Sequence, residues 1–261
     1  VHMSDYIICM DASGDIIREA AMENSIAFVP MEYSLGDEMR TSAGCEEESL
    51  LKQFYDGQRG GDLTRTSQIS PFMYEDFFKT FLEEGNSILY FCLSSGLSST
   101  YESSLLAAAN LKERYPNATL LPVDTLAATG GIGILVERAA ENRKRGMSLQ
   151  ENYEDVKAFV PHLRHYFMVQ DLMYLKRGGR VSAATAIVGS ALNIKPMLKI
   201  DENGKLVTVA VAKPPQMFGD IEFLKGHETL HGVVAETSTA LLCFTLEDVR
   251  DHLSSQAMPL S

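Results

Sequence analysis

The sequence predicts an α/β protein built from two α/β units. The first unit, residues 3–158, is expected to be a doubly wound parallel-sheet domain, and the second, residues 159–261, an α+β domain with a mixed sheet. In the first part, short apolar runs alternate with helical stretches, which is typical of a parallel sheet covered by helices on both faces. In the second part, two apolar runs separated by "ENG" (202–204) indicate a hairpin.

The elements of the first unit are expected to follow this alternation. Apolar runs of about four to eight residues predict buried strands, and longer amphipathic stretches predict helices. Ser70 before Pro71 is a typical pair for an N-cap and a first helical residue, and Gly57 is expected to end the preceding helix. The predicted elements are strands at 6–10, 25–31, 87–93 and 118–124, and helices at 46–57, 71–85, 99–114, 131–146 and 148–163.

The second unit is expected to begin with a strand, "HYFMVQDL" (165–172). A helix of small residues is predicted at 182–192, and the strands of the hairpin at 196–201 and 205–212. This mixture of a helix with a hairpin indicates an α+β arrangement.

Composition and charge exclude several classes of function. Hydrophobic residues make up 45% of the 261 residues, as in a globular protein, and no apolar run is long enough to span a membrane, so we expect no integral membrane association. The net charge of -12 argues against a nucleic-acid-binding surface. The four cysteines are far apart and form no C-x-x-C motif, so a reduced, cytoplasmic protein is expected.

Three junctions between predicted elements carry residues that suit an anion. Thr66, Ser67 and Ser70 precede the helix at Pro71, hydroxyls fill "LSSGLSST" (93–100), and a glycine cluster follows Asp124. Ligands of open parallel sheets bind beyond the carboxyl ends of the strands. Such residues also cap helices and form turns, and the glycine cluster lacks the G-x-G-x-x-G pattern of dinucleotide sites. Neutral hydroxyl donors suit one carboxylate better than a pyrophosphate.

Two other motifs indicate different chemistry. "LKRGGRVSAA" (175–184) is a basic turn that meets an anion or faces solvent. His227, Glu228 and His231 match H-E-x-x-H, the zinc-binding motif of a class of hydrolases. That motif requires a helix, whereas Gly226 and Gly232 bracket it here, so a zinc hydrolase is a remote third interpretation and no metal is expected.

Read together, six segments occur in the order typical of one family. They are "MDASGDI" (10–16), "TSQISP" (66–71), "LSSGLSSTYESS" (93–104), "VDTLAATGGIGILV" (123–136), "YLKRGGRVS" (174–182) and "LNIKPML" (192–198). In this order the chain resembles the DegV family, bacterial fatty-acid-binding proteins that serve as subunits of fatty acid kinase. Departures include Ile69 where the family has proline and Ser99 where it has glycine.

The resemblance implies a carrier and not an enzyme. A long-chain fatty acid would lie in a tunnel between the two units as the bound ligand, with no cofactor, and a separate ATP-dependent fatty acid kinase subunit would phosphorylate it. Carried over residue by residue, the donors to the fatty-acid carboxylate are hydroxyls, with Thr66 and Ser95 as the first choice. The full set is Thr66, Ser67, Ser94, Ser95 and Ser98, and Arg180 and Lys195 match basic positions near the site or the partner surface.

The C-terminal part departs from the family pattern. After about residue 212 the second unit is shortened or atypical, and an H-x-G-P-G-like segment is missing. An enzyme that acts on a small phosphorylated or carboxylated substrate is the alternative interpretation. It requires a nucleophile or base, and the sequence contains no G-x-S-x-G elbow.

Overall fold

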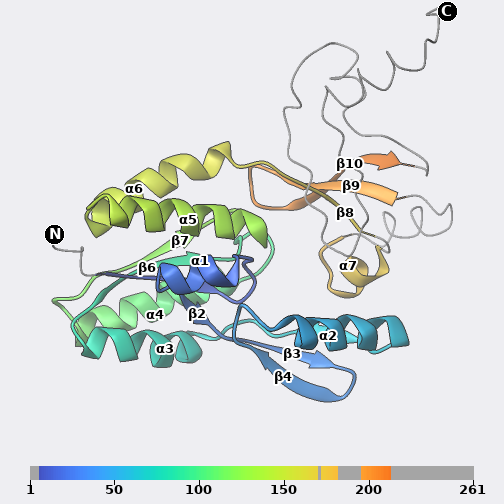
Figure 1. The fold of residues 1–261 in the computed structure, drawn as a ribbon, viewed down its shortest axis with the longest axis horizontal. Helices are drawn as coiled ribbons and strands as arrows, with labels where there is room; N and C mark the ends of the chain where they lie inside the picture. Colours follow the sequence, from blue (N-terminus) through green and yellow to red (C-terminus); the bar gives the residue numbers. More distant parts are fainter. Residues whose placement is uncertain (1–5, 170–171, 182–194, 213–261) are drawn as a thin grey trace, which may run out of the picture. The chain divides into compact units, whose positions relative to one another are not determined.

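The computed structural model describes residues 6–169, 172–181 and 195–212, which form two compact units (Figure 1). The first unit runs to His165 and also includes Ile200–Leu206. The second unit contains Tyr166–Lys199 and the chain from Val207 onward. Among the described residues, no helix is long and apolar enough to cross a bilayer.

A parallel sheet of four strands forms the centre of the first unit. Its order is β2-β1-β6-β7, and each neighbouring pair is parallel, as the alternating sequence pattern predicts. The strands are β1 (Tyr6–Asp11), β2 (Ala27–Val29), β6 (Ser87–Cys92) and β7 (Leu120–Asp124). Residues 88–92 of β6 are completely buried, because helices cover both faces.

The helices divide between the two faces of this sheet (Figure 1). One face packs against α1 (Arg18–Glu23), α5 (Gly130–Lys144) and α6 (Leu149–Phe159), and the other against α3 (Pro71–Glu83) and α4 (Thr100–Arg114). Alternation along each strand supplies both cores, since neighbouring side chains point to opposite faces. Met10 and Phe91 pack with α5, whereas Cys9 and Tyr90 pack with α3.

A second, antiparallel sheet was not expected from the sequence. It contains β3 (Met31–Leu35), β4 (Glu38–Ser42) and β5 (Thr64–Thr66) in the order β4-β3-β5. The strand predicted at 25–31 is confirmed only as β2, because Pro30 separates β2 from β3, and proline lacks the N–H that a central strand donates. Leu35 pairs with Glu38 across a two-residue turn, in which Gly36 has a φ of 59°.

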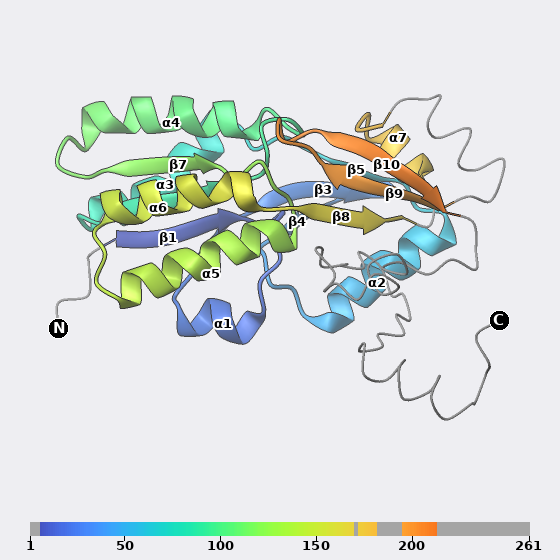
Figure 2. The same ribbon diagram turned by 90° about the horizontal axis from the view of Figure 1, so that it is seen from above.

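Helix α2 (Glu48–Gly60) packs on β3 of this sheet (Figures 1 and 2). The prediction that Gly57 ends this helix is wrong. Gly61 ends it, with a φ of 108° that favours glycine at this position. Gly57 instead lets the helix approach the sheet closely, since a Cβ there would lie 3.1 Å from Leu35.

Other helix boundaries follow the local signals. The Ser70 hydroxyl accepts the Met73 N–H at 3.3 Å, which confirms the predicted cap of α3. Ser148 and Glu151 form a reciprocal capping box at the start of α6. The helix predicted to 163 ends earlier, because Pro161 falls in the short 3-10 turn η1 (Val160–His162).

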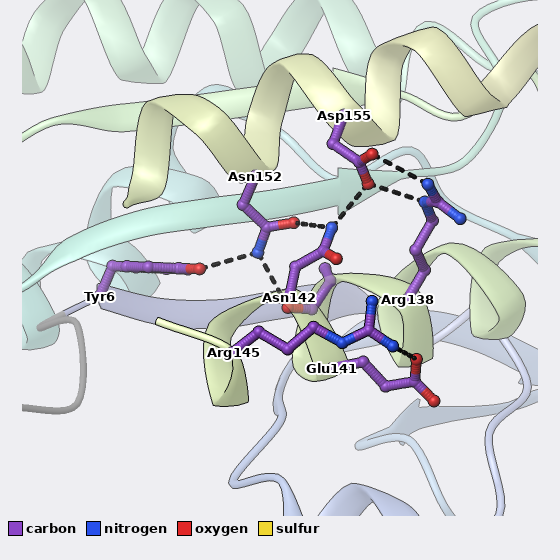
Figure 3. A network of polar contacts seen from close by, with 8 residues as sticks. Tyr6, Arg138, Glu141, Asn142, Arg145, Asn152 and Asp155 are labelled. Atoms are coloured by element: carbon purple, nitrogen blue, oxygen red, sulfur yellow. Dashed lines mark hydrogen bonds and ion pairs between the residues drawn. The ribbon is translucent and has the colours of Figure 1, made fainter. Parts of the chain in front are cut away.

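A polar network joins α5 to α6 (Figure 3). Arg138 donates two hydrogen bonds to Asp155, at 2.7 and 2.9 Å, and Asn142 bonds both Asp155 and the fully buried Asn152. Asn152 donates in turn to the Tyr6 hydroxyl at 2.7 Å. The two helices are thereby held in register over the end of β1.

The second unit contains most of a three-stranded sheet in the order β10-β9-β8. Its strands are β8 (His165–Met168), β9 (Lys195–Ile200) and β10 (Leu206–Ala212), and the last two match the predicted hairpin strands. The predicted basic turn begins as a short helix, α7 (Met173–Arg177), and turns at Gly178 and Gly179. The predicted helix at 182–192 lies outside the described residues, which resume at 195.

Candidate functional site

The hydroxyl-rich segment Leu93–Ser99, here called the serine loop, lies at the carboxyl end of β6 and leads into α4. Strand β6 is flanked by β1 and β7, so this loop is at the centre of the carboxyl edge of the sheet. That edge is where open parallel sheets bind ligands.

Every backbone N–H from Leu93 to Ser98 is donated to an acceptor inside the protein. Two go to carboxylates, one to a hydroxyl and three to carbonyls. The bonds are Leu93 to Asp11 Oδ2 (2.7 Å), Ser94 to the Ala127 carbonyl (2.9 Å), Ser95 to Asp124 Oδ1 (3.1 Å), Gly96 to Ser94 Oγ (3.1 Å), and Leu97 and Ser98 to the Ser94 carbonyl (3.0 and 3.2 Å). The loop therefore has no cradle of unpaired N–H groups of the kind that binds phosphate.

Two of the predicted carboxylate donors are already engaged. The buried Ser94 donates its hydroxyl to the Gly204 carbonyl at 2.7 Å. The Ser98 hydroxyl bonds that of Thr100 at 2.8 Å and accepts the N–H of Thr100, the first residue of α4. Ser95 is half-buried, and its hydroxyl has no hydrogen-bond partner among the described residues.

Ser94 ties the serine loop to the turn between β9 and β10. Gly204 belongs to this turn and has a φ of 71°. Gly96 lies so close to it that a Cβ would come within 2.5 Å of the Gly204 carbonyl. The loop is thus held on its outer side by backbone contact, which requires glycine at both positions.

Thr66 and Ser67 lie at the end of β5, just before the cap of α3. Both side chains are exposed, and neither hydroxyl has a hydrogen-bond partner within the described part of the chain. The neighbouring Gln68 side chain donates to the Ser99 carbonyl at 2.9 Å and to the Ser103 hydroxyl at 2.7 Å. This bridge brings the Thr66–Ser67 segment next to the serine loop, although 31 residues separate Gln68 from Ser99.

The glycine-rich junction between β7 and α5 is filled by the protein itself. A Cβ on Gly133 would overlap the Asp15 carbonyl oxygen, and one on Gly131 would overlap the His165 ring. The His165 Nε2 atom is buried and has no partner among the described residues, and burial lowers the pKa of this imidazole. The close approach expected of these glycines therefore serves packing at Gly131 and Gly133.

Asp11 is a site residue that the sequence reasoning missed. Its buried carboxylate accepts from the Ser13 backbone at 3.0 Å, from the Tyr90 hydroxyl at 3.2 Å and from Leu93. Burial raises the pKa of Asp11, and the hydrogen bonds from Ser13, Leu93 and Tyr90 oppose that rise. An acidic residue at the end of an apolar strand was the available signal, since a buried carboxylate needs several donors.

The predicted basic residues lie in the second unit. Arg180 is exposed after α7, and its guanidinium donates to the Gly178 carbonyl. Lys195 is the first residue of β9. His227, Glu228 and His231 are outside the described residues, within which no group of three or more His, Cys, Asp or Glu side chains is placed to hold a metal ion.

Comparison with known proteins gives consistent results. A sequence model described as "uncharacterised protein, DegV family" matches residues 6–214. A DegV domain-containing protein of Clostridium perfringens is 38% identical over 211 residues, which cover 81% of this chain and 72% of that protein.

Solved structures with the same fold include two that were described with fatty acids. A DegV family protein from Thermus thermophilus, reported for its fatty acid binding, is 28% identical, with a TM-score of 0.67 over 80% of this chain and 72% of that one. The fatty acid kinase B3 protein of Streptococcus pneumoniae, loaded with linoleic acid, is 21% identical, with a TM-score of 0.71 over 84% of this chain and 77% of that one. The second likeness concerns the fold alone.

Proposed function

This chain belongs to the DegV family, and from that premise we propose that it binds one long-chain fatty acid, with hydroxyl groups of the first unit as donors to the carboxylate. Ser95 and Thr66 are the first-choice donors, and Ser67 is next to them. Ser94 and Ser98 take structural roles in this proposal, because their hydroxyls are already bonded to Gly204 and Thr100.

One observation carries the proposal: the backbone N–H groups from Leu93 to Ser98 are all paired, while the Ser95 hydroxyl has no partner among the described residues. A hydroxyl donates one hydrogen bond, which suits one oxygen of a carboxylate. A phosphorylated small substrate, the alternative interpretation, is typically held by several unpaired N–H groups or by arginine. The loop offers neither, which favours the carboxylate.

The acyl chain would provide most of the binding energy. Each buried CH₂ group contributes about 0.8 kcal/mol, so a long chain is held far more strongly by apolar burial than by its head group. The resemblance implies that the acyl chain lies in a tunnel between the two units, and this remains a prediction.

We further propose that the protein is a carrier that presents the carboxylate to a separate ATP-dependent kinase subunit. There a carboxylate oxygen would take the terminal phosphoryl group of ATP, releasing ADP and leaving an acyl phosphate. The family resemblance supports this role, and the role in turn implies a cytoplasmic location, where such a kinase finds ATP. Arg180 and Lys195 are candidates for the contact with that partner or with the head group.

The first test is to extract the purified protein with solvent after native mass spectrometry and to identify what is released. A fatty acid at about one per chain is expected. Equilibrium binding of a fluorescent fatty acid is then compared in the wild type, Ser95→Ala and Thr66→Val. Each substitution removes one hydrogen bond to a charged group and should weaken binding by about tenfold or more.

Ser99→Ala is the matched control, because Ser99 is an exposed hydroxyl of the same loop whose side chain caps nothing. It should bind as the wild type does. A wild-type protein that is empty and takes up no fatty acid would contradict the proposal. The small-substrate enzyme would then be the better interpretation.

A further inference from the structure

The serine loop has an aspartate carboxylate on each side. Asp11 ends β1 and Asp124 ends β7, the two strands that flank β6. Asp11 accepts the Leu93 N–H at 2.7 Å, and Asp124 accepts the Ser95 N–H at 3.1 Å. The Ser95 hydroxyl therefore belongs to a residue whose own backbone is bonded to a carboxylate.

Neither carboxylate forms an ion pair with any described residue. Asp124 Oδ1 also accepts the Leu126 N–H at 3.2 Å, so this oxygen accepts two backbone hydrogen bonds. The Asp124 residue is half-buried, and salt screens the charge of such a group less than that of a surface group. The Asp124 carboxylate is thus bonded to the backbone of Ser95 and has no basic partner among the described residues.

We propose that Asp124 makes this site selective for head groups that carry a single negative charge; the inference rests on the proposed fatty-acid site. A carboxylate brings one negative charge to the Ser95 hydroxyl, whereas a phosphate monoester brings nearly two. The hydroxyl donors are neutral and supply no compensating charge, and in this proposal Arg180 and Lys195 contact the partner and not the head group. Repulsion from Asp124 therefore rejects the dianion, because like charges interact strongly at short range near a protein surface.

The consequence for a carrier concerns its product. An acyl phosphate has a head group with more negative charge than the fatty acid it comes from. The same repulsion weakens the hold of the site on that head group. Asp124 would therefore favour retention of the free acid and release of the phosphorylated form.

The test uses three ligands with acyl or alkyl chains of the same number of carbons, in competition with a fluorescent fatty acid at mildly alkaline pH. They are hexadecanoate, hexadecyl phosphate and hexadecyl methyl phosphate. The two phosphates have nearly the same head group, but the methyl ester carries one negative charge and the monoester nearly two. The wild type should bind the methyl ester about tenfold more tightly than the monoester.

Two variants separate charge from positioning. Asp124→Asn keeps an oxygen that accepts the Ser95 and Leu126 N–H groups but removes the charge, so it should bind both phosphates with similar affinity and still bind hexadecanoate. Asp124→Ala removes the acceptor as well and should weaken the binding of all three ligands. Asp76→Asn, at an exposed aspartate on α3, is the matched control and should behave as the wild type.

The outcomes distinguish this inference from the function on which it rests. Equal affinity of the wild type for both phosphates overturns the inference, and so does an Asp124→Asn variant that keeps the full preference for the methyl ester. In either case, hexadecanoate binding leaves the proposed function intact. A wild type that does not bind hexadecanoate overturns both.

Discussion

The junctions β6–α4 and β7–α5 lie at the carboxyl ends of neighbouring strands, and both have sequences that suit an anion. In the β6–α4 junction the backbone N–H groups from Leu93 to Ser98 are all paired, whereas the Ser95 hydroxyl has no partner in the described part of the chain. In the β7–α5 junction, Gly131 and Gly133 are pressed against other parts of the protein. Two junctions of similar composition thus differ in which polar groups folding leaves without a partner. Composition alone does not show which of them is the better candidate for a ligand site.

The second junction also supports the first. The Ala127 carbonyl accepts the Ser94 N–H at 2.9 Å, and the Thr125 hydroxyl donates to the Cys92 carbonyl at 2.6 Å. Asp124 accepts the Ser95 N–H from the same side. The β7–α5 junction therefore fixes the backbone position of Ser95.

The largest expected effect is on the free energy of unfolding, and it comes from a substitution in the packed β7–α5 junction. Gly133→Ala places a methyl group against the Asp15 carbonyl, which is backbone and cannot rotate away. Overpacking of this kind should lower the free energy of unfolding by about 3 kcal/mol. Chemical denaturation measured by circular dichroism gives this value.

Gly130→Ala is the matched control, since nothing lies within 4 Å of a Cβ there. Its stability should equal or slightly exceed that of the wild type, because alanine favours the helix. Equal stability of the two variants would show that the junction is looser than its contacts imply.

An effect of medium size is expected on stability, which should fall when Ser94 is replaced but not when Ser95 is replaced. Ser94→Ala leaves the buried Gly204 carbonyl and the Gly96 N–H without partners and should reduce the free energy of unfolding by about 1–2 kcal/mol. Ser95→Ala should leave stability unchanged and affect fatty-acid binding instead. Thermal unfolding of the two variants without ligand checks the difference, and a reversed order would contradict the assignment of the two hydroxyls.

The smallest expected effect is on the pH dependence of stability, and it involves His165. Burial lowers the pKa of His165 in the folded protein, whereas in the unfolded chain it is about 6.5. The unfolded chain therefore takes up a proton that the folded protein resists, so stability should fall as the pH drops below that ordinary value. His165→Phe keeps a ring against Gly131 and should show a weaker decline in denaturant titrations between neutral and mildly acidic pH. Parallel curves for the two proteins would remove His165 as the cause.

Much of the fold could be predicted because its signals are local. The apolar runs of β1, β6 and β7 and the Ser70–Pro71 cap depend on residues close in sequence. The antiparallel sheet was missed because β3 and β4 are short, half-exposed and polar, so their alternation is weak. The end of α2 was misplaced because Gly57 is required by its contact with Leu35, which no local pattern reveals.

For the candidate site, the sequence predicted the hydroxyl-rich junctions but not the roles of single residues. Whether a hydroxyl is available depends on partners distant in the chain. Ser94 meets Gly204 across 110 residues, and Leu93 meets Asp11 across 82. The donors to a carboxylate could therefore be named only as a set.

The α/β class, the parallel central sheet, the position of the serine loop at a strand end and the family resemblance could all be predicted from residues that are close together in the sequence. Hydrophobic periodicity and helix-capping residues predict such features, because each feature depends on a few neighbouring residues. Only the tertiary structure decided that Ser94 and Ser98 are engaged, that Ser95 is not, and that Asp11 and Asp124 lie on either side of it. The physical reason is that a polar group becomes a binding group only when folding brings it no internal partner.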